Sequence, residues 1–433
     1  MQAKLIVLDD DPTGSQTVHS CLLLTRWDAA TLKLGLNDAS PLMFVLTNTR
    51  ALPQPEARAV IRQVCLNLKP LLAEFNNPYL VISRSDSTLR GHYPLETEVI
   101  SEVLGPFDAH FLIPAFLEGG RFTEAGMHYV QMGDRRVPAH QTEFAKDSVF
   151  GYSNAFLPAY VEEKTQGRIK AAQVARFNLN EIRSGSLAKL MSLSGNVCCV
   201  VDAVSQTDLN LFARDLERAT HQGKRFLFRS AASLLTALAQ LPPQPVAGKD
   251  MAIYVKARRP GVVVVGSHVK KSTEQLTHLL KEPGIEGLEI DVDAVTADID
   301  KMRAATSQKL EQIHKKGRTP IIYTTREERH FDSDKARLEF GKAVSRFLVE
   351  VVKNLPQTIG FIISKGGITS NDVLSAGLEV RAARVAGQII PGCNLVLTPA
   401  NHPRFPALPV VIFPGNVGEA DSLATVYRSL RGS

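Results

Sequence analysis

The chain has 433 residues, a formal net charge of +6, 44% hydrophobic and 22% charged residues, a composition typical of a globular protein with two or three domains. Its lysines and arginines are spread along the chain, which disfavours a nucleic-acid partner and suits an anionic small molecule. No apolar run approaches the roughly 18 residues of a membrane helix, and the five irregularly spaced cysteines fit neither a zinc site nor a disulfide framework. No secretory leader is recognised, so we expect a cytoplasmic protein with reduced thiols and no membrane partner.

The first informative stretch is a short apolar run that ends in three consecutive carboxylates. Residues Leu5–Leu8 predict a buried strand, with Asp9, Asp10 and Asp11 where it ends. Ligands of open α/β sheets bind at this edge, and three adjacent acids need a cation, a polyhydroxylated ligand or positioned donors to compensate their repulsion. The alternative is an Asp-capped turn completed by the Pro-Thr-Gly that follows.

Strands and helices then alternate as far as residue 116. Short apolar runs predict the strands, and apolar residues at helical spacing predict the helices. The expected strands are Cys21–Thr25, Met43–Thr47, Tyr79–Ser83 and Phe111–Phe116, and the expected helices are Glu56–Phe75 and Glu96–Leu104. This alternation, with polar residues at the strand ends, is typical of a parallel α/β sheet.

A second polar loop directly follows the Tyr79–Ser83 strand. Within nine residues it offers Arg84, Asp86, Ser87, Thr88, Arg90, Gly91 and His92. Guanidinium groups recognise carboxylates in bidentate fashion, and Asp and Ser suit hydroxyls, so the set matches a hydroxy-acid ligand. An N-capped helix with a surface salt bridge is the alternative.

The rest of the first half carries weaker signals. Residues 118–123 form a glycine-bearing loop that is suited to lie over a site. Two further expected strands, Asn196–Val201 and Phe226–Phe228, end at Asp202 and at Arg229. Each of these two side chains either reaches a shared strand-end crevice or serves as a cap.

A proline-rich stretch beginning at Leu241 is the best linker in the chain. We therefore expect an N-terminal domain over residues 1–240, a linker over 241–252 and a C-terminal domain over 253–433. The linker is also the natural hinge.

Three strands of the second domain are expected to run into glycine-bearing turns. Glycine permits close approach of a backbone, and a helix N-terminus supplies free N–H groups and a partial positive charge, so such turns favour phosphate. The first strand and turn cover Gly261–Ser267, before a helix over His268–Lys281. The second strand, Thr358–Ser364, opens into the turn Lys365–Asp372, before a helix to Leu378, and the third strand and turn cover Val410–Gly418. Thr319–Thr325 is a further expected strand. One such turn is equally a small turn-and-cap motif, but three together predict a nucleotide site.

Several common signatures are missing from the sequence. There is no G-x-G-x-x-G for a dinucleotide, no G-x-x-x-x-G-K-[ST] phosphate loop, no G-x-S-x-G elbow and no H-E-x-x-H metal helix. These absences disfavour the common hydride-transfer, NTPase, esterase and zinc-protease classes.

Taken together, the motifs resemble the four-carbon acid sugar kinase family, whose members phosphorylate threonate, erythronate or 3-oxotetronate with ATP. The landmarks, in chain order, are Asp10-Asp-Pro-Thr-Gly14, Asp86-Ser-Thr-Leu-Arg-Gly91, Gly266-Ser267 with Gln275-Leu276, Gly366-Gly-x-Thr369 and Gly415-Asn-x-Gly418. The second landmark is the most specific. The chain departs from the family pattern at Arg84, at Ile368 and at Phe413-Pro414.

The resemblance implies an α/β protein of two domains, each a mainly parallel sheet flanked by helices, with a cleft between them. The N-terminal domain would bind the acid sugar and the C-terminal domain the nucleotide. The implied site residues are Asp10, Asp11 and Asp86 for catalysis, Arg84, Ser87, Arg90, Gly91 and His92 for the substrate, and Ser267, Gly366, Gly367, Ile368, Thr369, Gly415, Asn416 and Gly418 for ATP.

The mechanism expected from this resemblance is phosphoryl transfer, which asks a protein mainly for positioning and charge neutralisation. One of Asp10, Asp11 or Asp86 would accept the proton of the attacking hydroxyl, while Arg84 and Arg90 would hold the substrate carboxylate. The glycine turns and Mg²⁺ would carry the ATP phosphates, and a homodimer is a further expectation from the class of enzyme. The alternatives are a non-catalytic sensor of a sugar acid or nucleotide and a dehydrogenase acting on the same acids.

Overall fold

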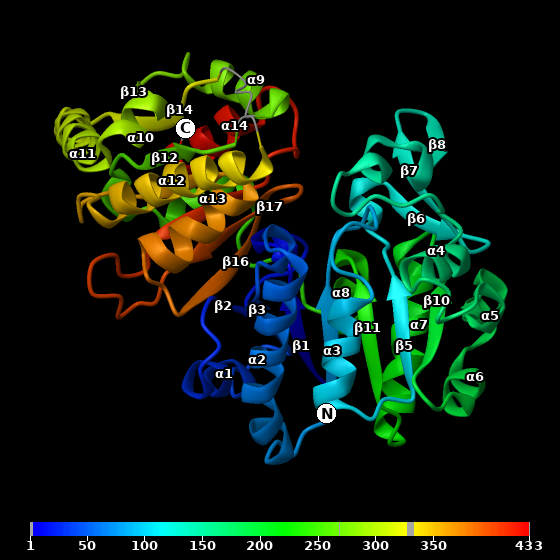
Figure 1. Ribbon diagram of the computed structural model, residues 1–433. Coiled ribbons are helices and arrows are strands. Elements are labelled where there is room, and N and C mark those ends of the chain that lie inside the picture. Colours follow the sequence, from blue (N-terminus) through cyan, green and yellow to red (C-terminus); the bar gives the residue numbers. More distant parts are fainter. Residues whose placement is uncertain (1–2, 268, 327–332, 433) are drawn as a thin grey trace. The chain divides into compact units, whose positions relative to one another are not determined.

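The computed structural model describes residues 3–267, 269–326 and 333–432. The chain divides into two compact units, Met1–Pro242 and Pro243–Ser433. Each unit is a mainly parallel sheet flanked by helices (Figure 1), which confirms the predicted two-domain α/β fold class.

The first unit is built on one parallel sheet with the strand order β2-β3-β1-β4-β11-β5-β10-β9. Its strands are β1 (Lys4–Asp9), β2 (Leu22–Leu24), β3 (Leu42–Leu46), β4 (Tyr79–Arg84), β5 (Ala109–Ile113), β9 (Ala175–Phe177), β10 (Val197–Val201) and β11 (Phe226–Ser230). The register pairs Asp9 with Arg84, and Arg84 with Ser230. Three polar side chains therefore end neighbouring strands at the same edge of the sheet.

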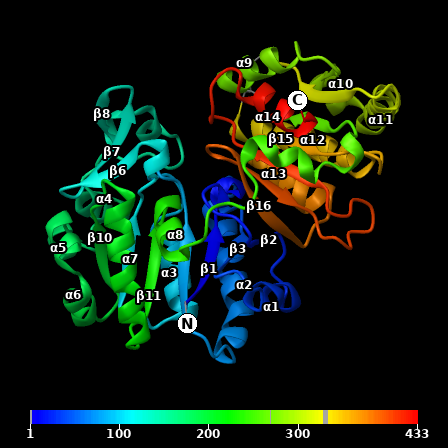
Figure 2. The same cartoon turned by 180° about the vertical axis from the view of Figure 1, so that it is seen from behind.

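Helices cover both faces of this sheet (Figures 1 and 2). The connections β3–α2–β4 and β4–α3–β5 run across the sheet in one direction and β10–α7–β11 runs in the other, so right-handed crossovers put α7 on the face opposite α2 and α3. The helices are α1 (Ala29–Leu36), α2 (Gln54–Ala73), α3 (Leu95–Leu104), α4 (Leu157–Lys164), α5 (Leu179–Ser184), α6 (Leu187–Ser192), α7 (Gln206–His221) and α8 (Ala232–Ala239).

A small antiparallel sheet in the first unit follows the order β6-β7-β8. Its strands are β6 (Arg121–Glu124), β7 (Met127–Met132) and β8 (Arg135–Pro138). The glycine-bearing loop predicted over residues 118–123 is therefore only partly a loop, because its last residues pair with β7.

The second unit has a parallel sheet with an antiparallel extension, in the order β13-β14-β12-β15-β18-β17-β16. The strands are β12 (Val262–Val265), β13 (Ile285–Ile290), β14 (Thr319–Thr324), β15 (Ile362–Lys365), β16 (Ala382–Ile390), β17 (Cys393–Leu397) and β18 (Pro409–Phe413). The register pairs Val265 with Lys365 and Lys365 with Phe413. The three predicted glycine turns thus begin at adjacent strand ends.

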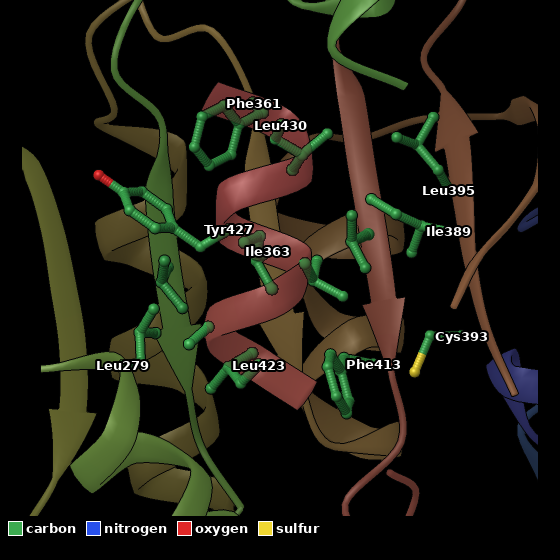
Figure 3. Packing of buried hydrophobic residues seen from close by; sticks show 14 of the residues in the cluster. Leu279, Phe361, Ile363, Ile389, Cys393, Leu395, Phe413, Leu423, Tyr427 and Leu430 are labelled. Carbon is green, nitrogen blue, oxygen red and sulfur yellow. The ribbon is translucent and has the colours of Figure 1, made fainter. Parts of the chain in front are cut away.

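Helix α14 closes one face of this sheet over a hydrophobic core. The buried side of the helix carries Leu423, Tyr427 and Leu430, which face Phe361 and Phe413 from the sheet (Figure 3). The helices of the unit are α9 (Lys270–Leu279), α10 (Val292–Ala297), α11 (Ile299–Lys315), α12 (Asp334–Lys353), α13 (Gly367–Asp372) and α14 (Ser422–Arg431).

Two helix predictions in this unit need correction. The helix expected from His268 begins at Lys270, and His268 itself lies outside the described residues. The helix expected to run to Leu378 is α-helical only to Asp372 and continues as a π-helical turn over Val373–Gly377.

Most of the predicted linker packs onto the second unit. The Gln244 amide donates to the Gln388 carbonyl at 3.0 Å and accepts from its N–H at 2.7 Å, and Met251 is buried in the core of that unit. The role of residues 241–252 as a hinge remains a prediction.

All five cysteines are free and buried, and their reduced state remains a prediction. Among the described residues, no helix has the length and apolar character needed to cross a membrane.

Candidate functional site

The opening carboxylates have three different environments, and Asp9 is the most enclosed. Neither of its oxygens accepts a hydrogen bond within the described residues, and the Arg84 guanidinium lies 3.6 Å from Oδ1. Burial raises the pKa of Asp9 well above its usual value, although Arg84 acts in the opposite direction. A side chain at Gly14 would lie 1.9 Å from Asp9 Oδ2, so the following turn requires glycine there.

Asp10 is the best-paired carboxylate of the three. Its Oδ1 lies 2.5 Å from Arg50 Nη2, and its Oδ2 accepts from Arg50 Nε at 3.2 Å and from the Ser85 hydroxyl at 2.7 Å. Burial alone would raise the pKa of Asp10, but Arg50, together with Arg229 and Arg84, outweighs burial and leaves this pKa lowered. The bidentate pair holds the end of β1 against the turn that follows β3.

Asp11 caps the short 3₁₀ helix over Pro12–Ser15, as the turn interpretation of the sequence expected. Its Oδ1 accepts from the N–H of Thr13 at 2.9 Å and from the Thr13 hydroxyl at 2.5 Å. Its Oδ2 lies 3.5 Å from Arg50 Nη1, and one fifth of the side chain is exposed. Arg50 therefore bridges Asp10 and Asp11.

Asp86 and Arg90 form the centre of the second polar loop. Arg90 Nε donates to Asp86 Oδ2 at 2.7 Å, and the Thr88 hydroxyl donates to the same oxygen. Burial would raise the pKa of Asp86, but Arg90 and then Arg50 hold it well below its usual range. Among the described residues, every hydrogen bond to this carboxylate reaches Oδ2, which leaves Oδ1 for a ligand.

A small pocket opens beside this pair in the first unit. Ser230 contributes a buried hydroxyl that makes no hydrogen bond within the described residues. A pocket that holds a free carboxylate oxygen and an unsatisfied hydroxyl suits a polar ligand. The lining residues are Ser85, Asp86, Leu89, Arg90, Leu112, Pro114, Tyr160, Arg229 and Ser230.

The other predicted substrate residues surround this pocket without lining it. His92 is buried, and its Nε2 lies 3.0 Å from the Thr49 carbonyl and 2.9 Å from the Leu52 carbonyl, so it secures the loop after β3. The Ser87 carbonyl faces His128 Nε2 at 2.7 Å. Gly91 has a φ of 115°, and a side chain there would lie 2.6 Å from Arg229 Nη2.

A buried charged network supports the pocket from below. Arg229 on β11 donates to Glu96 and, at 2.8 Å, to the Ser83 hydroxyl. The Ser83 hydroxyl also donates to Glu96 Oε2 at 2.8 Å, and the Thr49 hydroxyl to Oε1 at 2.6 Å. Because every polar group in this network is paired, it fixes the ends of β4 and β11. The other candidate, Asp202, accepts from the N–H of Gly126 at 2.8 Å, which ties it to the turn between β6 and β7 and, in the described part of the chain, to no helix N-terminus.

In the second unit the three glycine turns gather around Ser267. A side chain at Gly366 would lie 3.1 Å from Ser267 Cβ, and one at Gly415 would lie 3.0 Å from Ser267 Oγ. A side chain at Gly266 would lie 2.2 Å from Thr369 Oγ1. The absence of side chains at these glycines is what lets the turns approach one another and present backbone.

Lys365 is fully buried beneath these turns. Its Nζ donates to the Pro414 carbonyl at 2.6 Å and to the Gly415 carbonyl at 3.2 Å, and it lies 4.1 Å from the centre of the Phe413 ring. Burial lowers the pKa of Lys365 to about 7. The lysine joins the β15 turn to the β18 turn.

The remaining predicted nucleotide residues differ in exposure. Ile368 and Asn416 are exposed, whereas Thr369 is buried. Gly418 has a φ of 82° and lies against Ser422, where the buried Gln275 amide donates to the Val417 and Glu419 carbonyls at 2.9 Å. Gly367 begins α13, and its N–H group, like that of Ile368, has no acceptor within the helix.

Sequence reasoning missed three residues that the structure brings to these sites: Arg50, Ser85 and Lys365. Arg50 follows the end of β3, so the strand-end rule that singled out Asp10 also applies to it. Ser85 and Lys365 lie inside or beside stretches that the sequence had already marked.

Two family models match the chain. A model described as a sugar-binding N-terminal domain matches residues 5–238, and one described as a nucleotide-binding C-terminal domain matches residues 262–423. A D-erythronate kinase of Heliobacterium modesticaldum is 26% identical over 222 residues, which are 49% of this chain and 47% of that protein. The match thus spans about half the length of this relative.

Two solved structures share the fold. One is a Salmonella typhimurium LT2 protein provisionally named as a tRNA synthase, with a TM-score of 0.72, 18% identity and coverage of 99% of this chain and 100% of that one. The other is protein HI1011 of Haemophilus influenzae, with a TM-score of 0.66, 17% identity and coverage of 98% and 100%. At these identities the likeness concerns the fold alone.

Proposed function

Because the chain belongs to the four-carbon acid sugar kinase family, we propose that it transfers the γ-phosphoryl group of ATP to a hydroxyl of a four-carbon sugar acid. The acids in question are threonate, erythronate or 3-oxotetronate. The observation that carries the proposal is the pocket of the first unit, where Asp86 Oδ1 and the Ser230 hydroxyl both lack a protein partner among the described residues.

Asp86 is the carboxylate that we assign to the attacking hydroxyl. Both oxygens of Asp10 are already bonded to Arg50 or Ser85, and Asp11 is engaged as a helix cap. Asp86 lines the pocket and is ionised, so its Oδ1 accepts a hydrogen bond from the substrate hydroxyl and then its proton. Its low pKa suits a reaction in which positioning matters more than base strength.

The glycine turns of the second unit would hold the ATP phosphates. The N–H groups of Gly367 and Ile368 are suited to phosphate oxygens, and Gly366 and Gly415 allow the phosphates to approach the backbone. The hydroxyls of Ser267 and Thr369 are oxygen donors of the type that supplements phosphates and water around Mg²⁺. When bound with ATP, Mg²⁺ neutralises charge on the phosphates.

The test is ADP release from Mg-ATP by the purified protein with D- and L-threonate, D- and L-erythronate and 3-oxotetronate. We expect one acid to stimulate ADP release well above the ATPase background. A thermal unfolding series with ATP alone provides the companion measurement.

The two measurements separate the outcomes. No stimulation by any acid, with ATP still raising the unfolding temperature, would overturn the acceptor and retain the nucleotide site. No stimulation and no thermal shift would overturn the kinase proposal and favour the sensor alternative. The homodimer remains a prediction, which sedimentation velocity would check.

A further inference from the structure

Arg121, the first residue of β6, has an environment unlike that of the other arginines in the first unit's site. Its Nε is buried and makes no hydrogen bond within the described residues. Its Nη1 donates to the Gly119 carbonyl, and its Cζ lies 6.0 Å from the centre of the Phe116 ring. The guanidinium is thus held in place by a carbonyl and a ring, neither of which carries a negative charge.

The arginines at the ends of the neighbouring strands, by contrast, each have a carboxylate partner. The pairs are Arg50–Asp10, Arg84–Asp9, Arg90–Asp86 and Arg229–Glu96. Within the part of the chain that the structure describes, no carboxylate lies within 4.0 Å of the Arg121 guanidinium. Within the described residues, the positive charge of Arg121 is therefore not neutralised by direct contact with a carboxylate.

A partly buried cation without a counter-ion is less stable than one with an anion bound beside it. Burial lowers the pKa of Arg121, and Asp86 partly opposes this effect while Arg90 adds to it. The backbone of Arg121 also exchanges two hydrogen bonds with that of Phe116, at 2.9 and 3.0 Å, and Phe116 lies two residues after Pro114, which lines the pocket. Arg121 is not itself a lining residue, so it lies beside the pocket. Asp86 already forms an ion pair with Arg90 at 2.7 Å, so it does not serve as the counter-ion of Arg121.

The loop before Arg121 is built for close approach. A side chain at Gly119 would lie 2.5 Å from Arg121 Nη1, and Gly120 has a φ of 72°. Both glycines are therefore needed to bring the backbone around the guanidinium. This geometry holds Arg121 in one orientation, as a bidentate anion site requires.

We propose that Arg121 binds the carboxylate of the sugar acid and so determines the preference of the pocket for acids over neutral polyols. This inference rests on the proposed function and differs from the sequence expectation, which gave that role to Arg84 and Arg90. Arg84 is paired with Asp9, and Arg90 orients Asp86. Arg121 is thus a specificity-determining residue, while Asp86 serves the hydroxyl that reacts.

The experiment compares the full-length wild type with R121Q, R121K and the control R136Q. Arg136 is an arginine of the same small sheet that also stacks on an aromatic ring, 5.0 Å from the centre of Phe122, but it has a carboxylate partner in Glu124 at 3.0 Å. Binding of D- and L-erythronate, D- and L-threonate, 3-oxotetronate and erythritol is measured by calorimetry without ATP, and ATP binding is measured separately. Thermal unfolding checks that each variant folds.

We expect R121Q to bind the favoured acid at least about tenfold more weakly, R121K to be intermediate, and R136Q to match the wild type. Affinity for erythritol and for ATP should be unchanged in R121Q, and in turnover assays KM for the acid should rise far more than kcat falls. Wild-type affinity of R121Q for the acid would overturn the assignment of Arg121 and leave the kinase proposal standing. Failure of the wild type to bind any of the acids would overturn both.

Discussion

The two candidate sites use opposite means to present a strand edge to a ligand. In the first unit, acidic and basic side chains form ion pairs along the edge, as in Asp10–Arg50 and Asp86–Arg90. In the second unit, the edge is formed by glycines and hydroxyls around Ser267, with Lys365 as the buried charge beneath them. One site is defined by side chains and the other mainly by backbone.

This difference follows from what each ligand requires. A small acid with several hydroxyls offers few atoms, so selectivity needs directional side-chain hydrogen bonds. A triphosphate offers many equivalent oxygens, which N–H groups at glycine turns can bind without side-chain selectivity. The first site should therefore be impaired by substitutions that remove a side-chain charge. The second should be impaired by substitutions that add a side chain at a glycine.

The largest expected effect is on turnover in Asp86→Asn. The amide keeps the shape of the side chain but cannot accept the proton, so we expect kcat to fall about 10²–10⁴-fold with a smaller change in KM. Steady-state ADP release measures both. The matched control is Asp147→Asn, since Asp147 also faces Arg90, at 3.8 Å, and is a turn cap whose bonds asparagine can retain. Turnover of Asp86→Asn within fivefold of the wild type would move the role to Asp11.

Asp10→Asn should affect folding more than chemistry. Removing the charge leaves Arg50 without its closest partner, so we expect a loss of roughly 2–3 kcal/mol in the free energy of unfolding, measured with urea. Because the folded-state pKa of Asp10 is lowered, its contribution is present above its ordinary pKa and is lost as the pH falls towards the lowered value. The variant should therefore lose less stability than the wild type on acidification.

An exposed ion pair provides the comparison for that result. Glu102 on α3 lies 3.5 Å from Arg58, with both side chains about half exposed. Glu102→Gln should change stability by at most about 0.5 kcal/mol. Equal losses in Asp10→Asn and Glu102→Gln would contradict a structural role for the Asp10–Arg50 pair.

Gly366→Ala tests the requirement for space in the second site. Its φ of 117° and the 3.1 Å approach to Ser267 Cβ both oppose a side chain. We expect ATP affinity to fall about tenfold or more, measured by calorimetry, because the turn must shift. Gly317→Ala is the control, since Gly317 also has a positive φ, 71°, but has no atom within 4 Å of the added Cβ. Equal ATP affinities of the two variants would argue against the proposed phosphate turn.

The local parts of both sites were accessible from sequence because strand ends and glycine turns are local patterns. Short apolar runs predict β1, β4 and β12, and the structure has a strand at each of these places, followed by the predicted polar loop or glycine turn. The partner of each charge was not accessible, because Arg50 meets Asp10 only through the parallel pairing of β1 with β3. Sheet order is a long-range property that a single sequence does not specify locally.

Two regions without a clear periodic signal were missed for a related reason. The antiparallel strands β16 and β17 pair with a register shift, so their burial pattern is irregular. The small sheet of β6, β7 and β8 alternates polar and apolar residues over only a few positions. Arg121 lies at the start of that sheet, which is why the sequence marked its loop but not its side chain.

The smallest expected effect concerns the charge of Lys365. Its pKa of about 7 means that the folded protein loses this proton as the pH rises through 7, whereas the unfolded chain keeps it to about 10.5. Stability should accordingly rise with pH over that range. Cys393 on β17 and Lys271 on α9 also act on this lysine, the first favouring its charge and the second opposing it.

Loss of the same charge should weaken ATP binding, because Lys365 is the buried cation beneath the Gly415 turn. Between pH 6.5 and pH 8.5 we expect the affinity of the wild type for ATP to fall about threefold more than the affinity of Lys365→Met. Calorimetry measures both affinities, and the variant corrects for the ionisation of ATP itself. Parallel pH profiles would show that Lys365 only shapes the turn. By linkage, a difference between the two profiles would mean that bound ATP raises the pKa of Lys365. The free energy of that pKa shift equals the change in the free energy of ATP binding that the lysine charge produces.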